Sequence, residues 1–270
     1  PNLQQVPARD QNLAPLIRDL FLPEEGEDWV CADYAQQEPR VLVHYASLKK
    51  IDSALIARDS YHQDENTDFH QMVADMAEIS RKQAKTINLG LFYGMGQKKL
   101  AQELGLDEET AHSLFKKYHS RVPFVRTISN QVSNIASTRG YIKTLLGRKR
   151  RFNLWEPVDS FGEKAFPYSE AAAKYHKQKL KRAYTHKALN ALIQGSAADI
   201  TKAAMYQIYK AGLLNDINLL LTVHDELDFS IAPDKQKCLD EAIQIMKSCV
   251  KLEVPLRVDV ERGSTWGTIK

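Results

Sequence analysis

Short apolar runs and longer helical patterns follow one another along this chain. Apolar runs predict strands at 29–33, 219–223, 227–231 and about 256–260. His224, Asp225 and Glu226 stand between the second and third runs, which predicts a hairpin with a polar tip. Helical patterns at about 36–50 and 234–250 accompany the strands. The pattern as a whole predicts an α+β fold.

The middle of the chain is mostly helical in pattern. Several helical pieces are expected from about 68 to 138, with breaks near 94–96, Gly105 and Pro123. Further along we expect a strand or hairpin at 141–151, a loop at 152–167, and one long helical stretch from 168 to about 210 that bends near Gly195.

Four residues spaced four apart form the most informative pattern in this region. On a helix, Arg81, Lys85, Leu89 and Tyr93 would share one face, and Ser80 is well placed as the N-cap. Two cations followed by an apolar contact and an aromatic ring suit a nucleoside triphosphate, with the cations on the phosphates and the ring beside the base. The alternative is a solvated basic helix start that runs into a buried apolar end.

Two acidic positions suggest a metal site. Asp33 ends the first predicted strand, and Asp225 lies at the hairpin tip, so that the two carboxylates could meet across a sheet. Carboxylates held close together repel each other, and a hard divalent cation such as Mg²⁺ removes that cost. Two such ions make a phosphoryl-transfer site. An acidic turn by itself is more often only a turn.

Composition adds few constraints. The 270 residues are 43% hydrophobic, which is enough for a large core, and the net charge of +3 does not indicate a nucleic-acid partner by itself. Basic residues cluster at 148–151 and between 174 and 187, where such a run is most often a plain solvated face and phosphate contact is the alternative. Three cysteines without close spacing predict no zinc site or disulfide framework and suit a reducing compartment. We see no signal-peptide pattern and no membrane-spanning run.

Several motifs together resemble one enzyme family. DYAQQEPR at 33–40, the run from Arg81 to Gly94 and VHDE at 223–226 resemble motifs A, B and C of family A DNA polymerases. Their order and separations agree with the family, and further matches occur at 1–9, 67–70, 139–150, 188–200 and near the end. The resemblance covers nearly the whole chain. It implies a palm at 1–50 and 175–270 with an antiparallel sheet, helical fingers at 51–150, and a loop or insertion at 151–174.

The resemblance also implies an activity. The family transfers a deoxynucleotidyl group from a dNTP to a primer 3′-hydroxyl on a DNA template, using two Mg²⁺ ions. Asp33 and Asp225 would hold the ions with the backbone carbonyl of Tyr34, and Glu226 would support the primer end. These matches imply DNA replication in the cytoplasm of a bacterial or phage-infected cell, or in an organelle if the source is eukaryotic.

Further side chains are implied to contact the nucleotide and the DNA. The dNTP-binding set is Gln36, Glu38, His70, Arg81, Lys85, Leu89 and Tyr93. The DNA-binding set is Asn2, Gln5, Arg9, Arg139, Arg148, Asn190, Gln194 and His224. Glu38 would close over the sugar and exclude a 2′-hydroxyl. Leu89 stands where many relatives have Phe or Tyr, which predicts altered sugar discrimination that a comparison of normal and dideoxy nucleotides would test.

Three other departures from the family pattern are visible. Pro39 replaces a usual aliphatic residue and suits a first helical turn, whereas His186 replaces a common arginine. The stretch from 152 to 182 looks longer than in many relatives, as an extra DNA contact or merely an insertion. The family's thumb and proofreading exonuclease are expected to be absent from this chain.

Three alternative functions remain at this point. A single-subunit RNA polymerase shares the two aspartates and the Arg–Lys–Tyr helix, but Glu38 argues against it. A non-catalytic nucleic-acid-binding relative would not need both aspartates and both cations. The third alternative is one fragment or subunit of a split polymerase, inactive without a thumb on a missing N-terminal portion or partner chain.

Overall fold

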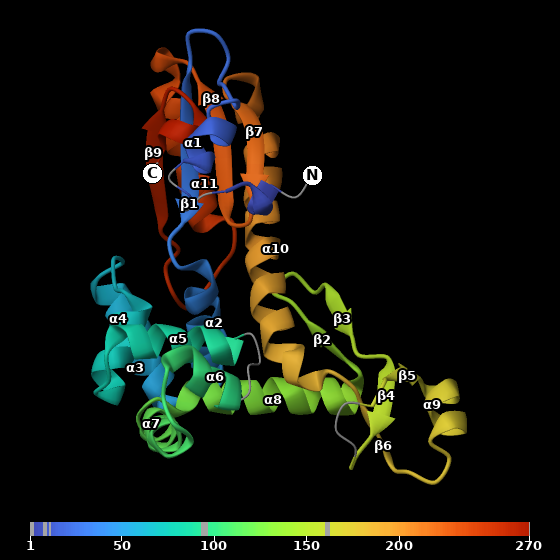
Figure 1. Cartoon of the computed structure of the whole chain (residues 1–270). Helices are drawn as coiled ribbons and strands as arrows, with labels where there is room; N and C mark the ends of the chain where they lie inside the picture. The colour runs from blue at the N-terminus through green and yellow to red at the C-terminus, as the bar shows by residue number, and fades with distance from the viewer. Residues whose placement is uncertain (1–2, 8–9, 11, 93–96, 160–162, 270) are drawn as a thin grey trace. The chain divides into compact units, whose positions relative to one another are not determined.

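The chain folds into two compact units. The computed structural model describes residues 3–7, 10, 12–92, 97–159 and 163–269 (Figure 1). One unit comprises residues 1–40 and 197–270, and the other comprises residues 41–196. The changes from one unit to the other fall inside α2 (Gln37–Leu48) and α10 (Ala188–Lys210), whereas the sequence boundaries were drawn at 50 and 174. A helix that continues through a boundary leaves no Gly- or Pro-rich linker in the sequence to mark it.

The first unit contains a four-stranded antiparallel sheet in the order β7-β8-β1-β9. Its strands are β1 (Asp28–Tyr34), β7 (Asn218–Val223), β8 (Glu226–Ile231) and β9 (Val258–Gly263). Its helices, apart from parts of α2 and α10, are α1 (Leu13–Arg18) and α11 (Gln236–Ser248) with the short 3₁₀ turns η1 (Leu3–Gln5), η3 (Leu213–Asn215), η4 (Pro233–Lys235) and η5 (Trp266–Thr268). The four predicted strands and the predicted helix before β9 are therefore confirmed.

The central strand β1 is buried on both faces. Because side chains alternate along a strand, Trp29, Cys31 and Asp33 point to one face and Tyr34 to the other. The Tyr34 hydroxyl donates a hydrogen bond to the Met246 carbonyl of α11 at 2.8 Å, so α11 covers that face. On the opposite face the Trp29 ring stacks on Trp266 of η5, with 6.3 Å between ring centroids. Asp33 therefore lies on the face that carries η5.

The second unit begins with a group of helices. Besides its part of α2 they are α3 (Asp52–Gln63), α4 (Phe69–Ala77), α5 (Arg81–Phe92), α6 (Gln97–Leu104), α7 (Glu108–Arg121) and α8 (Pro123–Arg139). The predicted helical pieces are confirmed, with breaks at Gly105 and at Pro123, which occupies the first turn of α8. The predicted break at 94–96 lies outside the described residues.

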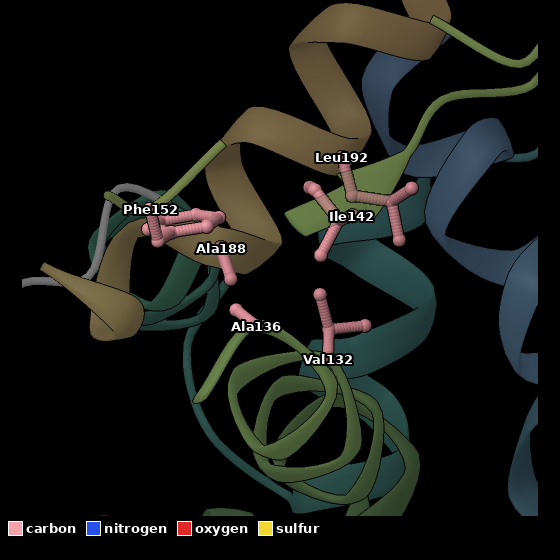
Figure 2. Close-up of a cluster of buried hydrophobic side chains, with 6 residues drawn as sticks. All are labelled: Val132, Ala136, Ile142, Phe152, Ala188 and Leu192. Atoms are coloured by element: carbon pink, nitrogen blue, oxygen red, sulfur yellow. The ribbon is translucent and has the colours of Figure 1, made fainter. Parts of the chain in front are cut away.

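A small apolar cluster joins α8 to a hairpin and to the start of α10 (Figure 2). The predicted hairpin is confirmed as β2 (Tyr141–Lys143) paired with β3 (Lys149–Arg151). The members of the cluster are Val132 and Ala136 of α8, Ile142 of β2, Phe152, and Ala188 and Leu192 of α10. All six are nearly inaccessible to solvent, so their burial holds the hairpin against both helices.

Two of our predictions for residues 152–210 are wrong. The expected loop at 152–167 contains β4 (Leu154–Pro157) and β5 (Phe166–Pro167), which form a three-stranded sheet with β6 (Leu180–Arg182) in the order β5-β4-β6. The expected single helix is interrupted: α9 (Tyr168–Lys174) is followed by β6 and by η2 (Thr185–Lys187) before α10 starts at Ala188. α10 is then continuous through Gly195. Strands this short show no clear period in sequence, and their pairing overrides the helix propensity of the lysine-rich stretch.

None of the helices in the described ranges is both long enough and apolar enough to span a lipid bilayer.

Candidate active site

In the first unit, Asp33 lies in the middle of a row of carboxylates. In the antiparallel register the partner of Asp33 on β8 is Glu226, and its partner on β9 is Asp259. Asp225 precedes Glu226 in the β7–β8 turn, and its carbonyl accepts a hydrogen bond from the Tyr34 amide at 3.3 Å. The predicted acids Asp33, Asp225 and Glu226 are thus brought together. A cavity of about 160 Å³ opens on this face, with Arg18 and Trp266 among its other lining residues.

Neighbouring carboxylates destabilise the ionised forms of Asp33 and Asp228. Burial, together with the negative charges of Asp225, Glu226 and Asp259, raises the pKa of Asp33 to about 7. Two positions beyond Glu226, burial and the Glu226 charge raise the pKa of Asp228 to about 8. Indole N–H groups partly offset this charge, because Trp29 donates to Asp228 at 3.1 Å and Trp266 donates to Glu226 at 3.2 Å.

This donor set fits a hard divalent cation. Around Asp33 the groups are carboxylate oxygens, which are the ligands that Mg²⁺ prefers. A bound cation would favour the ionised form of Asp33, which the neighbouring negative charges now disfavour. On the same face Cys31, Glu226 and Asp228 offer ligand atoms within 4.8 Å of one another, but burial raises the pKa of the Cys31 thiol and keeps it protonated.

The turn that presents Asp225 has an unusual backbone. His224 has a φ of +62°, in the left-handed region that favours glycine, so a two-residue turn links β7 to β8. The ring donates through Nδ1 to Asp225 Oδ1 at 2.7 Å, and its Nε2 lies 3.6 Å from Glu38 Oε1. This hydrogen bond, with the charges of Asp225, Glu38 and Asp33, raises the pKa of His224. His224 therefore links the β7–β8 turn to the buried carboxylate at the start of α2.

The segment between β1 and α2 is fixed by a buried arginine. Gln36, expected near the nucleotide, takes a left-handed φ of +51° between the strand and the helix. The Arg40 guanidinium donates from Nε to the Ala35 carbonyl at 2.9 Å and from Nη1 to the Pro255 carbonyl at 2.7 Å. Because Arg40 is 1% exposed, it holds this connection in place rather than meeting a ligand.

In the second unit the predicted cationic helix is α5. Ser80 and Gln83 form a capping box, in which Ser80 Oγ accepts from the Gln83 amide at 3.2 Å and Gln83 Oε1 accepts from the Ser80 amide at 3.0 Å. Arg81 and Lys85 are exposed and Leu89 is half-buried, whereas Ala84, Ile87 and Asn88 between them are buried. The expectation of one accessible face is thus confirmed for 81–89. Tyr93 lies outside the described residues.

Arg81 is held by a neighbouring carboxylate. Its Nε and Nη2 donate to Asp68 Oδ2 at 3.0 and 2.6 Å. Asp68 also caps α4, because its Oδ1 accepts from the backbone amides of His70 and Gln71. Burial opposes ionisation here, but the hydrogen bonds from Arg81 and Gln71 hold the pKa of Asp68 below its usual value. The guanidinium is therefore oriented before any ligand arrives.

His70 sits at the end of a buried polar chain. The Tyr118 hydroxyl donates to Asn88 Oδ1 at 2.5 Å, which leaves the Asn88 amide group to donate to His70 Nδ1 at 3.2 Å. Tyr118 and Asn88 are fully buried, and His70 is 8% exposed. Burial and the charges of Arg81 and Lys85 lower the pKa of His70. A neutral His70 that accepts at Nδ1 carries its proton on Nε2.

The expected DNA-contacting residues are placed less uniformly. Gln5 and Arg139 are exposed, and Asn190 and Gln194 are half-buried on α10. Arg148 donates from Nη2 to the Gly195 carbonyl at 2.7 Å, which ties the β2–β3 turn to α10. Asn2 and Arg9 lie outside the described residues.

Sequence reasoning missed five polar residues of these two groups: Asp259, Asp228, Asp68, Asn88 and Tyr118. Strands were predicted over Asp33 and over Asp259, but not that these two strands pair, so the carboxylates could not be placed side by side. The buried amide and phenol could be found only from the fold, since Asn88 and Tyr118 lie on different helices.

Comparison with known proteins identifies the family of this chain. A family description, DNA polymerase family A, matches residues 1–268. The chain belongs to DNA polymerase family A. It is 40% identical to the DNA-directed DNA polymerase of Pseudomonas phage M6 over 99% of this chain. It is also 32% identical to the DNA polymerase I of Rhizobium leguminosarum over 98% of this chain.

A solved structure supports the same family A fold. The POL domain of Pol1 from M. smegmatis, in a complex with DNA primer-template and dNTP, matches with a TM-score of 0.79 and 31% identity. The match covers 100% of this chain and 45% of that chain. The chain spans 42% of the phage M6 polymerase and 25% of the Rhizobium protein. The α+β fold with antiparallel sheets is thus that of a family A polymerase domain.

Proposed function

We propose that this chain carries the nucleotidyl-transfer centre of a template-directed DNA polymerase. The observation that carries the proposal is the row of carboxylates around Asp33, whose raised pKa calls for a cation. Asp33 and Asp225, with the backbone carbonyl of Tyr34, would hold Mg²⁺, and Glu226 would support the primer end. Bound Mg²⁺ would lower the pKa of the primer hydroxyl and neutralise charge on the triphosphate and the departing pyrophosphate.

The chain's own side chains supply orientation. Arg81, held by Asp68, and Lys85 would bind the phosphates of the dNTP, while the Nε2 proton of His70 would donate to a phosphate oxygen. Leu89 and Tyr93 would border the sugar and base, as would Gln36. Primer-template DNA would meet Gln5, Arg139, Arg148, Asn190, Gln194, His224, Asn2 and Arg9. We assign the palm to residues 1–50 and 175–270 and the fingers to residues 51–150. The origins of the relatives support the cytoplasm of a bacterial or phage-infected cell as the setting.

Primer extension with Mg²⁺ and deoxynucleotides tests the centre. Asp225→Asn keeps the shape of the side chain but removes its charge, and we expect the extension rate to fall by at least about 100-fold. Asp240→Asn, an exposed change on α11, is the matched control and should extend normally. Equal rates for Asp225→Asn and the unmutated chain would refute the assignment. If neither the unmutated chain nor Asp225→Asn extends the primer, the fragment alternative is supported, because this chain spans only 42% of the phage M6 polymerase.

Sugar selection separates DNA from RNA synthesis. Glu38 is 9% exposed and lies 3.6 Å from the His224 ring, so its carboxylate is held rather than free to swing. Glu38→Ala should raise ribonucleotide use relative to deoxynucleotide use by at least about tenfold, because the space for a 2′-hydroxyl opens. The measurement is the ratio of kcat/KM values for the two nucleotides. A preference of the unmutated chain for ribonucleotides would favour the RNA polymerase alternative instead.

A further inference from the structure

Positive charge is concentrated in one short part of the second unit. Residues 149–187, which we call the basic segment, contain ten lysines and arginines and four aspartates and glutamates. Its net charge is +6, whereas the whole chain carries +3, so the remaining residues sum to −3. The segment contains β3, the sheet β5-β4-β6, α9 and η2 (Figure 1). Its strand β6 contacts α8 through Arg182, which donates to the Ser137 carbonyl. A charge separation of this kind marks a surface for a polyanion.

Few of these cations are paired with a carboxylate in the described part of the segment. Nine of the ten are exposed, and Arg182 alone is half-buried, where it donates to the carbonyls of Ser137 and Phe152. Within the described part of the segment, Lys181 is the one cation with a carboxylate inside 4 Å, Glu156 at 3.8 Å. The exposed cations remain available to phosphates, although five of them also lie over aromatic rings. The counterions that they attract in solution would be released on binding.

Aromatic rings alternate with these cations on the same segment. Tyr168 is 60% exposed and meets the Trp155 ring edge to face, with 5.1 Å between centroids, while Arg182 lies 4.5 Å above that Trp155 ring. Tyr184 is 42% exposed, and the Lys187 ammonium lies 5.3 Å from its ring. Tyr184 also has a φ of +60°, a backbone conformation that bulky residues rarely adopt. Exposed rings beside cations form a stacking platform for unpaired bases.

We propose that the basic segment binds single-stranded DNA, with its lysines on the phosphates and Tyr168 and Tyr184 stacked on bases. A single strand fits better than a duplex because bases within a duplex are stacked on one another and offer no free face to a tyrosine. The surface lies outside the carboxylate row and the α5 cations, so it goes beyond the proposed catalytic centre. The inference does not rest on polymerase activity, since it is tested by binding without Mg²⁺ and without nucleotides.

The charge contribution is tested by the salt dependence of binding to an oligothymidylate about 16 nucleotides long, measured by fluorescence anisotropy. The triple variant Lys174→Gln, Lys177→Gln and Lys179→Gln should lower the slope of log K against log salt by about 2, since each single-strand contact contributes about 0.7. Affinity near 0.1 M salt should fall by at least about tenfold. The control triple Lys210→Gln, Lys237→Gln and Lys251→Gln changes exposed lysines of the first unit and should retain the slope. Equal slopes for both triples would overturn the proposal.

The stacking contribution is tested by the two tyrosines. Tyr168→Ala with Tyr184→Ala should weaken oligothymidylate binding about tenfold or more and leave the salt slope unchanged. Tyr168→Phe with Tyr184→Phe keeps both rings and should bind normally, which separates stacking from loss of fold. An abasic oligomer of the same length should bind the unmutated chain more weakly and be insensitive to both pairs of changes. Equal binding of the abasic oligomer, or tighter binding of a duplex that the alanine pair does not weaken, would overturn the single-strand assignment.

Discussion

At the residue scale, partners that are distant in sequence decide which proton His70 carries. The pKa of His70 is lowered by burial and by Arg81 and Lys85, so the ring is neutral near pH 7. The unfolded chain therefore binds more protons than the folded one below the ordinary value of 6.5. The fold is therefore more stable above pH 6.5, where His70 is neutral in both states, and it loses stability as the pH falls below 6.5. Neutral His70 can donate to an anion only through Nε2, because Asn88 donates to Nδ1.

The tautomer of His70 depends on Tyr118. Tyr118→Phe removes the hydroxyl that holds Asn88 Oδ1, so the amide can rotate and accept from Nδ1–H instead. We expect ¹⁵N–¹H NMR of histidine-labelled protein to show the Nε2–H form in the unmutated chain and a mixture of tautomers in the variant. Tyr206→Phe, which changes a 61% exposed ring, serves as the control. Unchanged His70 ring shifts in Tyr118→Phe would contradict this role.

Residue identity and spacing predicted some of the carboxylates around Asp33 and some of the polar residues around α5. Asp33 and Asp225 could be found because one ends an apolar strand and the other tips a hairpin, and Arg81 and Lys85 because helical spacing is local. Asp259 and Asn88 could not be found in this way. Only tertiary folding brings Asp259 beside Asp33 and brings the Tyr118 hydroxyl to Asn88.

At the element scale, a glycine lets the β2–β3 turn approach α10 closely. A Cβ atom on Gly195 would lie 2.6 Å from Thr144 Cγ2, so the site has no room for a methyl group. Ser196 adds hydrogen bonds to the same contact. Its hydroxyl accepts from the Leu145 amide at 3.1 Å and is hydrogen-bonded to the Tyr45 hydroxyl at 2.9 Å. Gly195 therefore serves close packing of the hairpin, and the helix continues through it.

Gly195→Ala tests this packing against helix propensity. Alanine in a helix interior is favoured over glycine by about 1 kcal/mol, but the clash should cost about 1–3 kcal/mol, so a net loss of stability is expected. Adding Thr144→Ser removes Cγ2 and keeps the hydroxyl that donates to the Arg148 carbonyl. The double variant should be more stable than Gly195→Ala alone in urea unfolding, with a positive coupling between the two sites. Additive effects would show that the clash is not the cause.

Long elements were predicted better than short ones. The four strands of the first unit and the helices α4–α8 have enough residues for their apolar period to be visible. β5 has two residues and β6 has three, and each exists because it pairs with β4. Tyr184, which precedes η2 with a left-handed backbone, carries no sequence signal such as glycine.

At the scale of the whole molecule, the carboxylate row makes the metal-free fold less stable than it would otherwise be. The pKa of Asp33 in the folded chain is about 7, against an ordinary 3.8. Between these values the folded state holds a proton that the unfolded state has released, so stability falls as the pH rises through this window. Above pH 7 the stability contributed by the proton on Asp33 is fully lost. This is the sign expected of a site arranged for a cation rather than for stability.

Asp33→Asn should therefore stabilise the metal-free chain while abolishing activity. At pH 8 the amide removes a buried charge that costs on the order of 2–4 kcal/mol, so the unfolding temperature should rise; at pH 4 the two proteins should differ little. Adding Mg²⁺ should stabilise the unmutated chain at pH 8 and leave Asp33→Asn nearly unchanged, because binding to the folded state alone shifts unfolding by mass action. Asp240→Asn should show neither effect. A variant that is less stable than the unmutated chain at pH 8 without Mg²⁺ would contradict a destabilising charge at Asp33 and, with it, the raised pKa.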